Sequence, residues 1–104
     1  SKLNTIMITE KLYTNPNLKL SEVALKLEVS SHELSKLIND NIYKNFTDFI
    51  NEYRIEEAKQ LIEANSIYTI EAIGNQSGFN SKSTFYHIFK KYTGKTPAEF
   101  RKES

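Results

Sequence analysis

The chain has 104 residues, 38% hydrophobic and 26% charged, which is enough for one compact domain or two small lobes. It contains no Cys, so a disulfide framework and a thiolate metal site are excluded, and a reducing cytoplasm is the expected compartment. No apolar run approaches the length of a membrane span, and a net charge of +1 by itself gives no support to a nucleic-acid partner.

The first third of the chain has apolar residues at helical spacing. A first helix is predicted to include Lys11 and Leu12 and to end at residues 14–17, where Pro16 interrupts the pattern. A short second helix has Ser21 as its expected cap. The apolar residues of these two helices are Leu3, Ile6 and Met7, then Val23, Ala24 and Leu27.

Two longer helices follow. Ser30 and Glu33 have the spacing of a capping box, in which each side chain accepts from the other residue's backbone N–H, so a third helix is predicted to start here. The longest helix is predicted over residues 46–64. The predicted apolar faces are Leu34, Leu37 and Ile38 in the third helix and Phe46, Phe49, Ile50, Tyr53, Ala58, Leu61 and Ile62 in the fourth.

The last third of the chain predicts three more helices. One runs over residues 69–73, and the next covers residues 81–92 and is ended by Gly94. Residues 96–99 (Thr-Pro-Ala-Glu) place a cap, a proline and an acid in the order that starts a short last helix. The fold class is therefore all-α, with seven helices.

The pattern occurs twice. Leu20, Val23, Ala24, Val29 and Ser31 recur fifty positions later as Ile70, Ile73, Gly74, Phe79 and Ser81. After one extra residue, Leu34, Leu37, Ile38, Asn45 and Phe49 match Phe85, Ile88, Phe89, Thr96 and Phe100. Each copy is a short helix, a tight turn and a second helix. This is the layout of a helix-turn-helix, whose second helix enters the major groove of DNA.

The residue types at the turns fit this layout. Two short helices that cross steeply need a small residue at the contact, and Ala24 and Gly74 lie at that position. Gly78 supplies the left-handed backbone that the turn requires. The first copy has Glu28 at this place, so an identical turn is not predicted there. Phe79 is predicted to fill the gap between the helices, as Val29 does in the first copy.

Long ordered motifs carry a family resemblance. They are residues 46–58, 70–74 (Ile-Glu-Ala-Ile-Gly), 77–85 (Ser-Gly-Phe-Asn-Ser-Lys-Ser-Thr-Phe) and 93–101 (Thr-Gly-Lys-Thr-Pro-Ala-Glu-Phe-Arg). Together they resemble the DNA-binding domain of the AraC/XylS family of transcription regulators, over about residues 18–102. The sequence departs from the family pattern at Gly74, where Ala is usual, and at Glu28 and Tyr43, where Gly is usual.

The resemblance implies one DNA-binding domain with two helix-turn-helix subdomains, at residues 1–45 and 65–104. Residues 46–64 form the linker helix between them, about 27 Å long at 1.5 Å per residue. Two recognition helices held about 34 Å apart would enter successive major-groove segments of double-stranded DNA. Such a monomer would bind an asymmetric site.

The outer faces of the two recognition helices are polar. On the resemblance, the base-reading residues are His32, Ser35 and Lys36 in the first copy and Lys82, Ser83, Tyr86 and His87 in the second. Lys and His donate hydrogen bonds to guanine, and Tyr86 fits against a thymine methyl group. For each of these residues, an ordinary solvated surface position is the competing interpretation.

A second set of residues is predicted to contact phosphate. Its members are Ser31, Ser81, Thr84, Lys90, Lys91 and Arg101. Residues 70–104 hold six basic and three acidic residues, whereas residues 1–69 hold eight and ten. The basic excess lies in the second copy, where it favours contact with the DNA backbone, although a solvated charged face explains the counts equally well. For Arg54 in the linker helix, a salt bridge to Glu57 is favoured over a phosphate contact.

Other functions are less well supported. The sequence has no catalytic or metal-binding motif, so we expect no enzyme activity, cofactor or metal. The alternative is a helical protein–protein interaction module, which needs an exposed apolar groove. RNA binding ranks lower, because the aromatic residues lie on the predicted inner faces.

Further partners follow from the resemblance. The chain opens on Ser1, and we expect it to be a piece of a bacterial regulator whose N-terminal sensing or dimerisation domain lies elsewhere. RNA polymerase is a further expected partner. The fragment alone is predicted to be a monomer.

Overall fold

Seven α-helices and one short 3-10 helix make up the parts of the chain that the structure describes, residues 2–42, 44–64 and 67–104. The structure is a computed structural model. The elements are α1 Lys2–Glu10, η1 Leu12–Thr14, α2 Leu20–Leu27, α3 Ser31–Asn41, α4 Phe46–Glu63, α5 Ile70–Ser77, α6 Lys82–Thr93 and α7 Pro97–Glu103. The described residues contain no strand, which confirms the all-α fold class and the number of helices.

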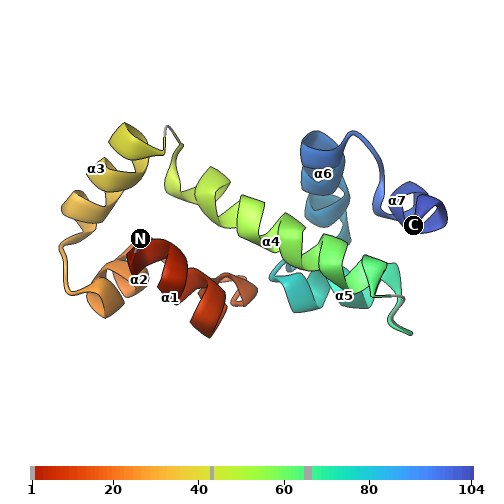
Figure 1. The fold of residues 1–104 in the computed structure, drawn as a ribbon, viewed down its shortest axis with the longest axis horizontal. Helices are drawn as coiled ribbons and strands as arrows, with labels where there is room; N and C mark the ends of the chain where they lie inside the picture. Colours follow the sequence, from red (N-terminus) through yellow and green to blue (C-terminus); the bar gives the residue numbers. More distant parts are fainter. Residues whose placement is uncertain (1, 43, 65–66) are drawn as a thin grey trace.

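The long helix α4 joins two lobes, each with its own core (Figure 1). The first lobe contains α1, η1, α2 and α3, and its core takes Phe49 and Ile50 from α4. The second lobe contains α5, α6 and α7, and its core takes Ile55, Ala58 and Ile62 from the other half of α4. The linker helix therefore supplies apolar side chains to both lobes, and its position is fixed at both ends.

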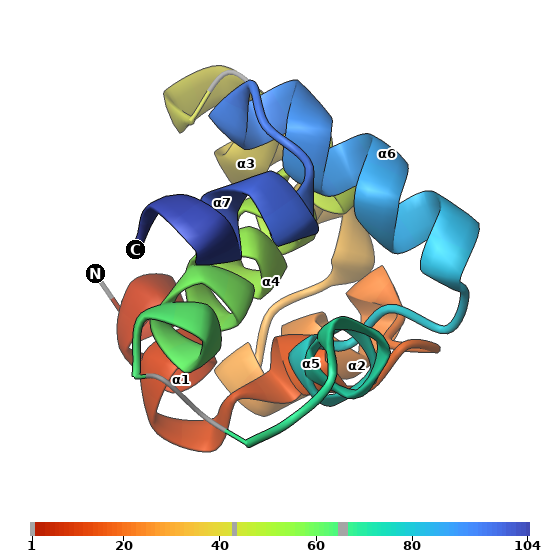
Figure 2. The same cartoon turned by 90° about the vertical axis from the view of Figure 1, so that its right-hand side faces the viewer.

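The two lobes place equivalent elements at equivalent positions. The molecule measures 42 × 23 × 23 Å, with α3 at one end of the long axis and α6 in the other lobe, where α7 lies beyond it at the far end (Figure 1). In the end-on view, α2 and α5 overlap, and α3 and α6 both lie on the upper side of α4 (Figure 2). The repeat in the sequence is thus a repeat in space.

Most of the helix starts lie where the capping residues predict them. Ser30 Oγ accepts from the N–H of Glu33 at 3.0 Å, and the Glu33 carboxylate accepts from the N–H of Ser30. Thr96 and Glu99 form the same reciprocal pair at the start of α7. Thr69 and Ser81, the residues at which the next helices were predicted to start, accept from backbone N–H groups as the caps of α5 and α6. These hydrogen bonds satisfy backbone N–H groups that have no partner within the helix.

Three predicted boundaries are wrong. Helix α5 continues to Ser77, four residues beyond its predicted end. Helix α2 starts at Leu20, because the Glu22 carboxylate accepts from the backbone N–H of Lys19 at 2.8 Å and closes the first turn without Ser21. Helix α1 ends at Glu10, because Lys11 adopts a left-handed backbone with φ of 48°. The chain then continues as the separate element η1.

The turns of the two copies have the same backbone geometry. Val29 N–H donates to the carbonyl of Ala24 at 3.0 Å, and Phe79 N–H donates to that of Gly74 at 3.0 Å. Both are the long hydrogen bond of a Schellman turn, which requires a left-handed residue just before the donor. Gly78 has φ of 112°, and Glu28 adopts φ of 59° in its place. Glu28 therefore keeps the same type of turn, a point that the sequence alone left open.

Glu28→Gly is expected to raise the free energy of unfolding by about 0.5–1 kcal/mol. A left-handed backbone costs an L-residue roughly 1–2 kcal/mol, and the greater freedom of unfolded Gly offsets only part of this gain. Chemical denaturation followed by circular dichroism measures the difference. Gln60→Gly in the exposed face of α4 is the control, and it should lose about 1 kcal/mol. A loss of stability in Glu28→Gly would contradict the role of backbone strain.

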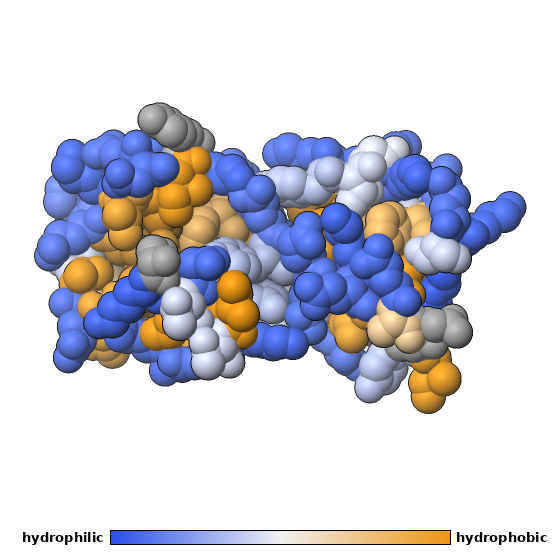
Figure 3. All heavy atoms as spheres, in the orientation of Figure 1, coloured by the Kyte–Doolittle hydropathy of each residue, from blue (hydrophilic) through white to orange (hydrophobic). Residues whose placement is uncertain are grey.

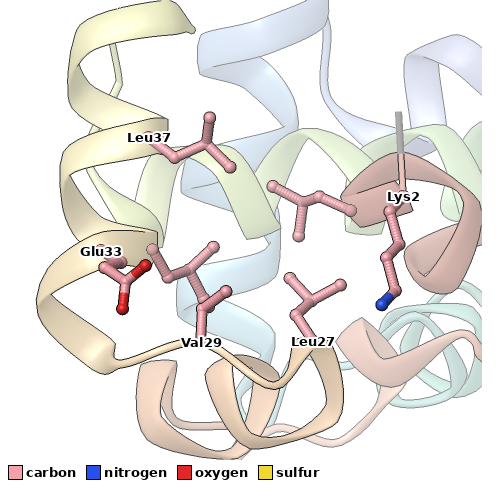
Figure 4. Close-up of a pocket in the computed structure, with 7 residues that line it drawn as sticks. Lys2, Leu27, Val29, Glu33 and Leu37 are labelled. Carbon is pink, nitrogen blue, oxygen red and sulfur yellow. The ribbon is translucent and has the colours of Figure 1, made fainter.

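Most of the predicted core is confirmed, and Leu37 and Ile55 are among the exceptions. Leu37 was expected to face inward, but it is 43% exposed. It lines an open apolar cleft of about 350 Å³ between α1, α2 and α3, together with Leu27 and Val29 (Figure 4). Apolar surface is visible over this lobe in Figure 3. Conversely, Ile55 in α4 was not assigned to the core and is 3% exposed.

Candidate nucleic-acid interface

The outer face of α3 begins directly after its capping box. Because Leu34 and Ile38 are fully buried, the opposite side of the helix faces solvent. Ser31, His32 and Lys36 are exposed, and Ser35 is half-buried. The first two turns of α3 therefore present Ser31, His32, Lys36 and the acidic Glu33 to solvent.

The outer face of α6 is set in the same way. Phe85 and Phe89 are buried, and six of the predicted contact residues on this helix are exposed. They are Lys82, Ser83, Thr84, His87, Lys90 and Lys91. Tyr86 is half-buried, with its ring edge-on to Phe85 at a centroid distance of 5.9 Å. Lys82 Nζ lies 5.5 Å from the centre of the Tyr86 ring, which is within cation–π range.

The basic residues of the second lobe do not all lie together. His87, Lys90 and Lys91 line one shallow hollow on α6. Arg101 is in α7, where its Nη2 donates to the backbone carbonyl of Tyr68 at 2.7 Å. Arg101 thus ties α7 to the segment before α5, a structural role that its sequence position does not reveal. Ser81 Oγ accepts from the N–H of Thr84 at 3.1 Å and so caps α6.

Lys36 is held by a neighbouring acid. Its Nζ lies 2.9 Å from Asp40 Oδ2, one helical turn along α3, and both side chains are more than half exposed. This hydrogen bond raises the pKa of Lys36. The pair was not predicted, although its spacing of four residues is visible in the sequence. The bond to Asp40 engages one of the three N–H donors of the Lys36 ammonium group.

The two polar faces are separated along the long axis of the molecule. Helix α3 lies at one end of the molecule and α6 in the other lobe, and both lie on the same side of α4 (Figures 1 and 2). Within the described ranges, no three His, Asp or Glu side chains gather as a metal site. The helices of the same ranges include none that is long and apolar enough to cross a membrane.

Comparison with known proteins identifies the family. A helix-turn-helix domain family matches residues 11–103. The chain is 32% identical to the C-terminal domain of the two-component response regulator YesN from Fusobacterium nucleatum. The two structures superpose with a TM-score of 0.80, and the alignment includes 96% of this chain and 94% of that structure. The chain belongs to the AraC-type helix-turn-helix family.

Other members of the AraC-type family are larger proteins. The chain is 32% identical over 87 residues to the Msm operon regulatory protein of Streptococcus mutans, which is 84% of the chain and 31% of that relative. It is 34% identical over 100 residues to an uncharacterised HTH-type transcriptional regulator of Staphylococcus aureus, which is 96% of the chain and 13% of that protein. The chain therefore spans less than a third of each. Transcription regulation through DNA binding is the function of the family.

The AraC-type fold is also that of the C-terminal domain of AraT, a response regulator from Geobacillus stearothermophilus. That structure is 25% identical, with a TM-score of 0.84 over 99% of this chain and 83% of its own. Of the three departures from the family pattern, Glu28 keeps the turn, and Gly74 is explained by the nearby ring of Phe85. A Cβ atom at Gly74 would lie 2.5 Å from Phe85 Cδ2. Tyr43 lies outside the described residues.

Asp40→Asn is expected to raise the affinity for double-stranded DNA by about threefold at low salt, because it frees Lys36 and removes a negative charge from the outer face of α3. Fluorescence anisotropy with a short duplex measures the change. Glu56→Gln is the matched control, since it removes the same charge from the Lys59 ion pair on α4. An equal gain in both variants would assign the effect to net charge and contradict a specific role for Asp40.

Proposed function

We propose that the chain binds double-stranded DNA sequence-specifically, with α3 and α6 in successive major-groove segments on one face of the duplex. The observation that supports this most is the repeated placement of two polar-faced helices, one in each lobe and both on one side of α4. Recognition helices that enter successive major-groove segments on one face of a duplex lie one helical turn apart. A monomer would then contact an asymmetric site.

The proposed base-reading residues lie near the start of each recognition helix. They are His32, Ser35 and Lys36 in α3 and Lys82, Ser83, Tyr86 and His87 in α6. Exposure supports Lys36, His32 and His87 in particular, because each has an outward side chain that donates to guanine O6 or N7. Tyr86 packs on Phe85, so only the outer part of its ring is available for a thymine methyl group.

The proposed phosphate contacts position the chain without reading sequence. Lys90 and Lys91 are the best supported, since both are exposed on the same hollow of α6 as His87. Ser31, Ser81 and Thr84 lie at the N-terminal ends of α3 and α6, where backbone N–H groups favour an anion. Arg101 is the least supported, because its guanidinium already bonds to the Tyr68 carbonyl.

The whole protein is proposed to extend beyond this chain. Residues 1–45 and 65–104 would form two subdomains of one DNA-binding domain, with residues 46–64 as the linker. A separate N-terminal domain would sense the signal or dimerise, RNA polymerase would be a further partner, and the protein would act in the bacterial cytoplasm. The small share of each relative that the chain spans supports the existence of further domains.

The alternative, a protein-interaction module, is favoured by the apolar cleft beside Leu37. It is ranked lower because the cleft lies in one copy of the repeat, whereas both copies present polar outer faces.

Selection of bound sequences from a random pool of duplex DNA tests the proposal. We expect enrichment of one asymmetric site with two conserved blocks about 10 base pairs apart. Recovery of DNA without any enriched motif would contradict sequence-specific binding and leave the interaction module as the better candidate.

A further inference from the structure

The two lobes contact each other directly as well as through α4. The segment after α1 contacts both α4 and α5, and Figure 1 shows it reaching toward the end of α5. The contact involves Tyr13, Asn15, Arg54, Gly78 and Phe79, which we call the lobe junction. These residues come from η1, from α4 and from the turn of the second helix-turn-helix.

The first-lobe side of the junction is firmly held. Tyr13 is buried, and its ring stacks on Tyr53 at a centroid distance of 5.7 Å. Its hydroxyl donates to Glu57 Oε1 at 3.0 Å. The same carboxylate accepts from Lys11 Nζ at 3.2 Å. The backbone of η1 is therefore fixed against the middle of α4.

Arg54 connects this backbone to the second lobe. Its Nε donates to the carbonyl of Tyr13 at 2.7 Å, and its Nη2 donates to that of Asn15 at 2.9 Å. The guanidinium also lies 5.9 Å from the centre of the Phe79 ring in the second lobe. The planar guanidinium holds its N–H donors in fixed directions, so it loses little side-chain entropy for each hydrogen bond that it makes. The ammonium group of a Lys lacks this fixed arrangement of donors. These contacts replace the Glu57 salt bridge expected from the sequence.

Gly78, in the turn of the second lobe, lies directly against the guanidinium group of Arg54. A Cβ atom there would lie 2.7 Å from Arg54 Nε and still closer to the carbonyl oxygen of Tyr13. In the first copy, the equivalent Glu28 is exposed and adopts a left-handed backbone as well. The second turn thus requires Gly for a reason the first lacks, namely its contact with the other lobe.

We propose that the lobe junction, together with α4, fixes the separation and relative direction of α3 and α6. A lobe held along one helix is able to tilt about that helix, and a second contact away from the helix axis removes this freedom. The importance of this angle for DNA rests on the proposed function, but the angle itself is a property of the free protein. Arg54 and Gly78 are positioning residues in this proposal and do not touch DNA.

Distance measurement between the recognition helices tests the junction without DNA. The chain has no Cys, so Asn39→Cys in α3 and Lys91→Cys in α6 accept spin labels at two exposed sites. Pulsed electron paramagnetic resonance then gives the distribution of distances. We expect a narrow distribution in the parent chain, and a shifted and broader one in Gly78→Ala.

Gly94→Ala is the matched control. Gly94 also has a left-handed backbone, with φ of 80°, but nothing lies within 4 Å of its Cβ position. Both substitutions place a Cβ atom on a left-handed backbone, and only Gly78→Ala inserts a methyl group between the lobes. We expect Gly94→Ala to keep the parent distance distribution. A shift of equal size in both variants would assign the change to strain and overturn the proposal.

Arg54→Met tests the other half of the junction and leaves the turn unchanged. It should broaden the distribution while circular dichroism shows an intact helical content, and Lys59→Met on the same helix should not. If Gly78→Ala does not fold, the comparison of Arg54→Met with Lys59→Met tests the proposal on its own. A folded Arg54→Met chain with the parent distribution overturns the proposal.

DNA binding provides a separate readout. With the site enriched from the random pool, we expect Arg54→Met to lose about tenfold in affinity for the two-block duplex and almost nothing for a duplex with one block, because only the former needs both helices in register. If no site is enriched, the proposed function fails while the distance measurement still decides the role of the junction.

Discussion

Phe85→Ala is expected to lower the free energy of unfolding by about 3–5 kcal/mol, the range for removing a large buried aromatic side chain. Phe85 is 1% exposed and lies at the centre of the second core. Its ring centroid is 5.2 Å from that of Phe79 and 5.7 Å from that of Phe89. The Phe85 ring also packs directly on the backbone of Gly74. Because Gly74 has no side chain, it cannot fill the cavity that Phe85→Ala would leave.

Urea denaturation followed by circular dichroism measures this loss. Leu25→Ala is the control, because Leu25 is 78% exposed in α2 and its truncation should change stability by no more than about 0.5 kcal/mol. DNA binding should fall with the loss of folded α6. A loss below about 1 kcal/mol in Phe85→Ala would show that the close contact of α5 and α6 does not depend on this ring.

Lys36→Ala and His87→Ala are each expected to cost about 1–3 kcal/mol on the enriched DNA site and to relax the preference at one base pair. Lys90→Ala and Lys91→Ala should instead weaken binding to every sequence. Each should also reduce the slope of log affinity against log salt concentration by about one. The difference arises because base edges vary with sequence and phosphates do not.

Fluorescence anisotropy on the enriched and a shuffled duplex, at several salt concentrations, separates the two classes. Lys26→Ala removes a basic residue that pairs with Glu10 on the first lobe, away from both proposed recognition faces, and should change neither slope nor preference. Identical behaviour of all four interface variants would show that the division into base-reading and phosphate contacts is wrong.

Local signals in the sequence account for most of the fold. The capping pairs at Ser30 and Thr96 each act over three residues, so spacing alone places the starts of α3 and α7. The repeat adds tertiary information, because the same helix-turn-helix pattern implies the same packing twice. It even extends to Asn45, which caps α4 as Thr96 caps α7.

Long-range contacts explain what the sequence did not predict. The partners of Arg54 are backbone carbonyls about forty positions away. Every residue has such a carbonyl, so the sequence does not indicate which ones accept a hydrogen bond. The exposure of Leu37 depends on how closely α1 approaches α3. Helical periodicity predicts the face on which a residue lies but not the distance to the neighbouring helix. The sequence left the turn at Glu28 open, because a left-handed backbone is costly for an L-residue but not forbidden. The hydrogen bond from Arg101 to Tyr68 could not be predicted either, because its acceptor is also a backbone carbonyl.

Chemical footprinting of the chain on its enriched DNA site tests the central claim most directly. Two helices held on one side of α4 should contact two major-groove segments centred about 10 base pairs apart on one face of the duplex. Lys36→Ala should weaken one of these contacts, and His87→Ala the other. A single contacted segment, or two segments on opposite faces of the duplex, would contradict simultaneous binding by α3 and α6.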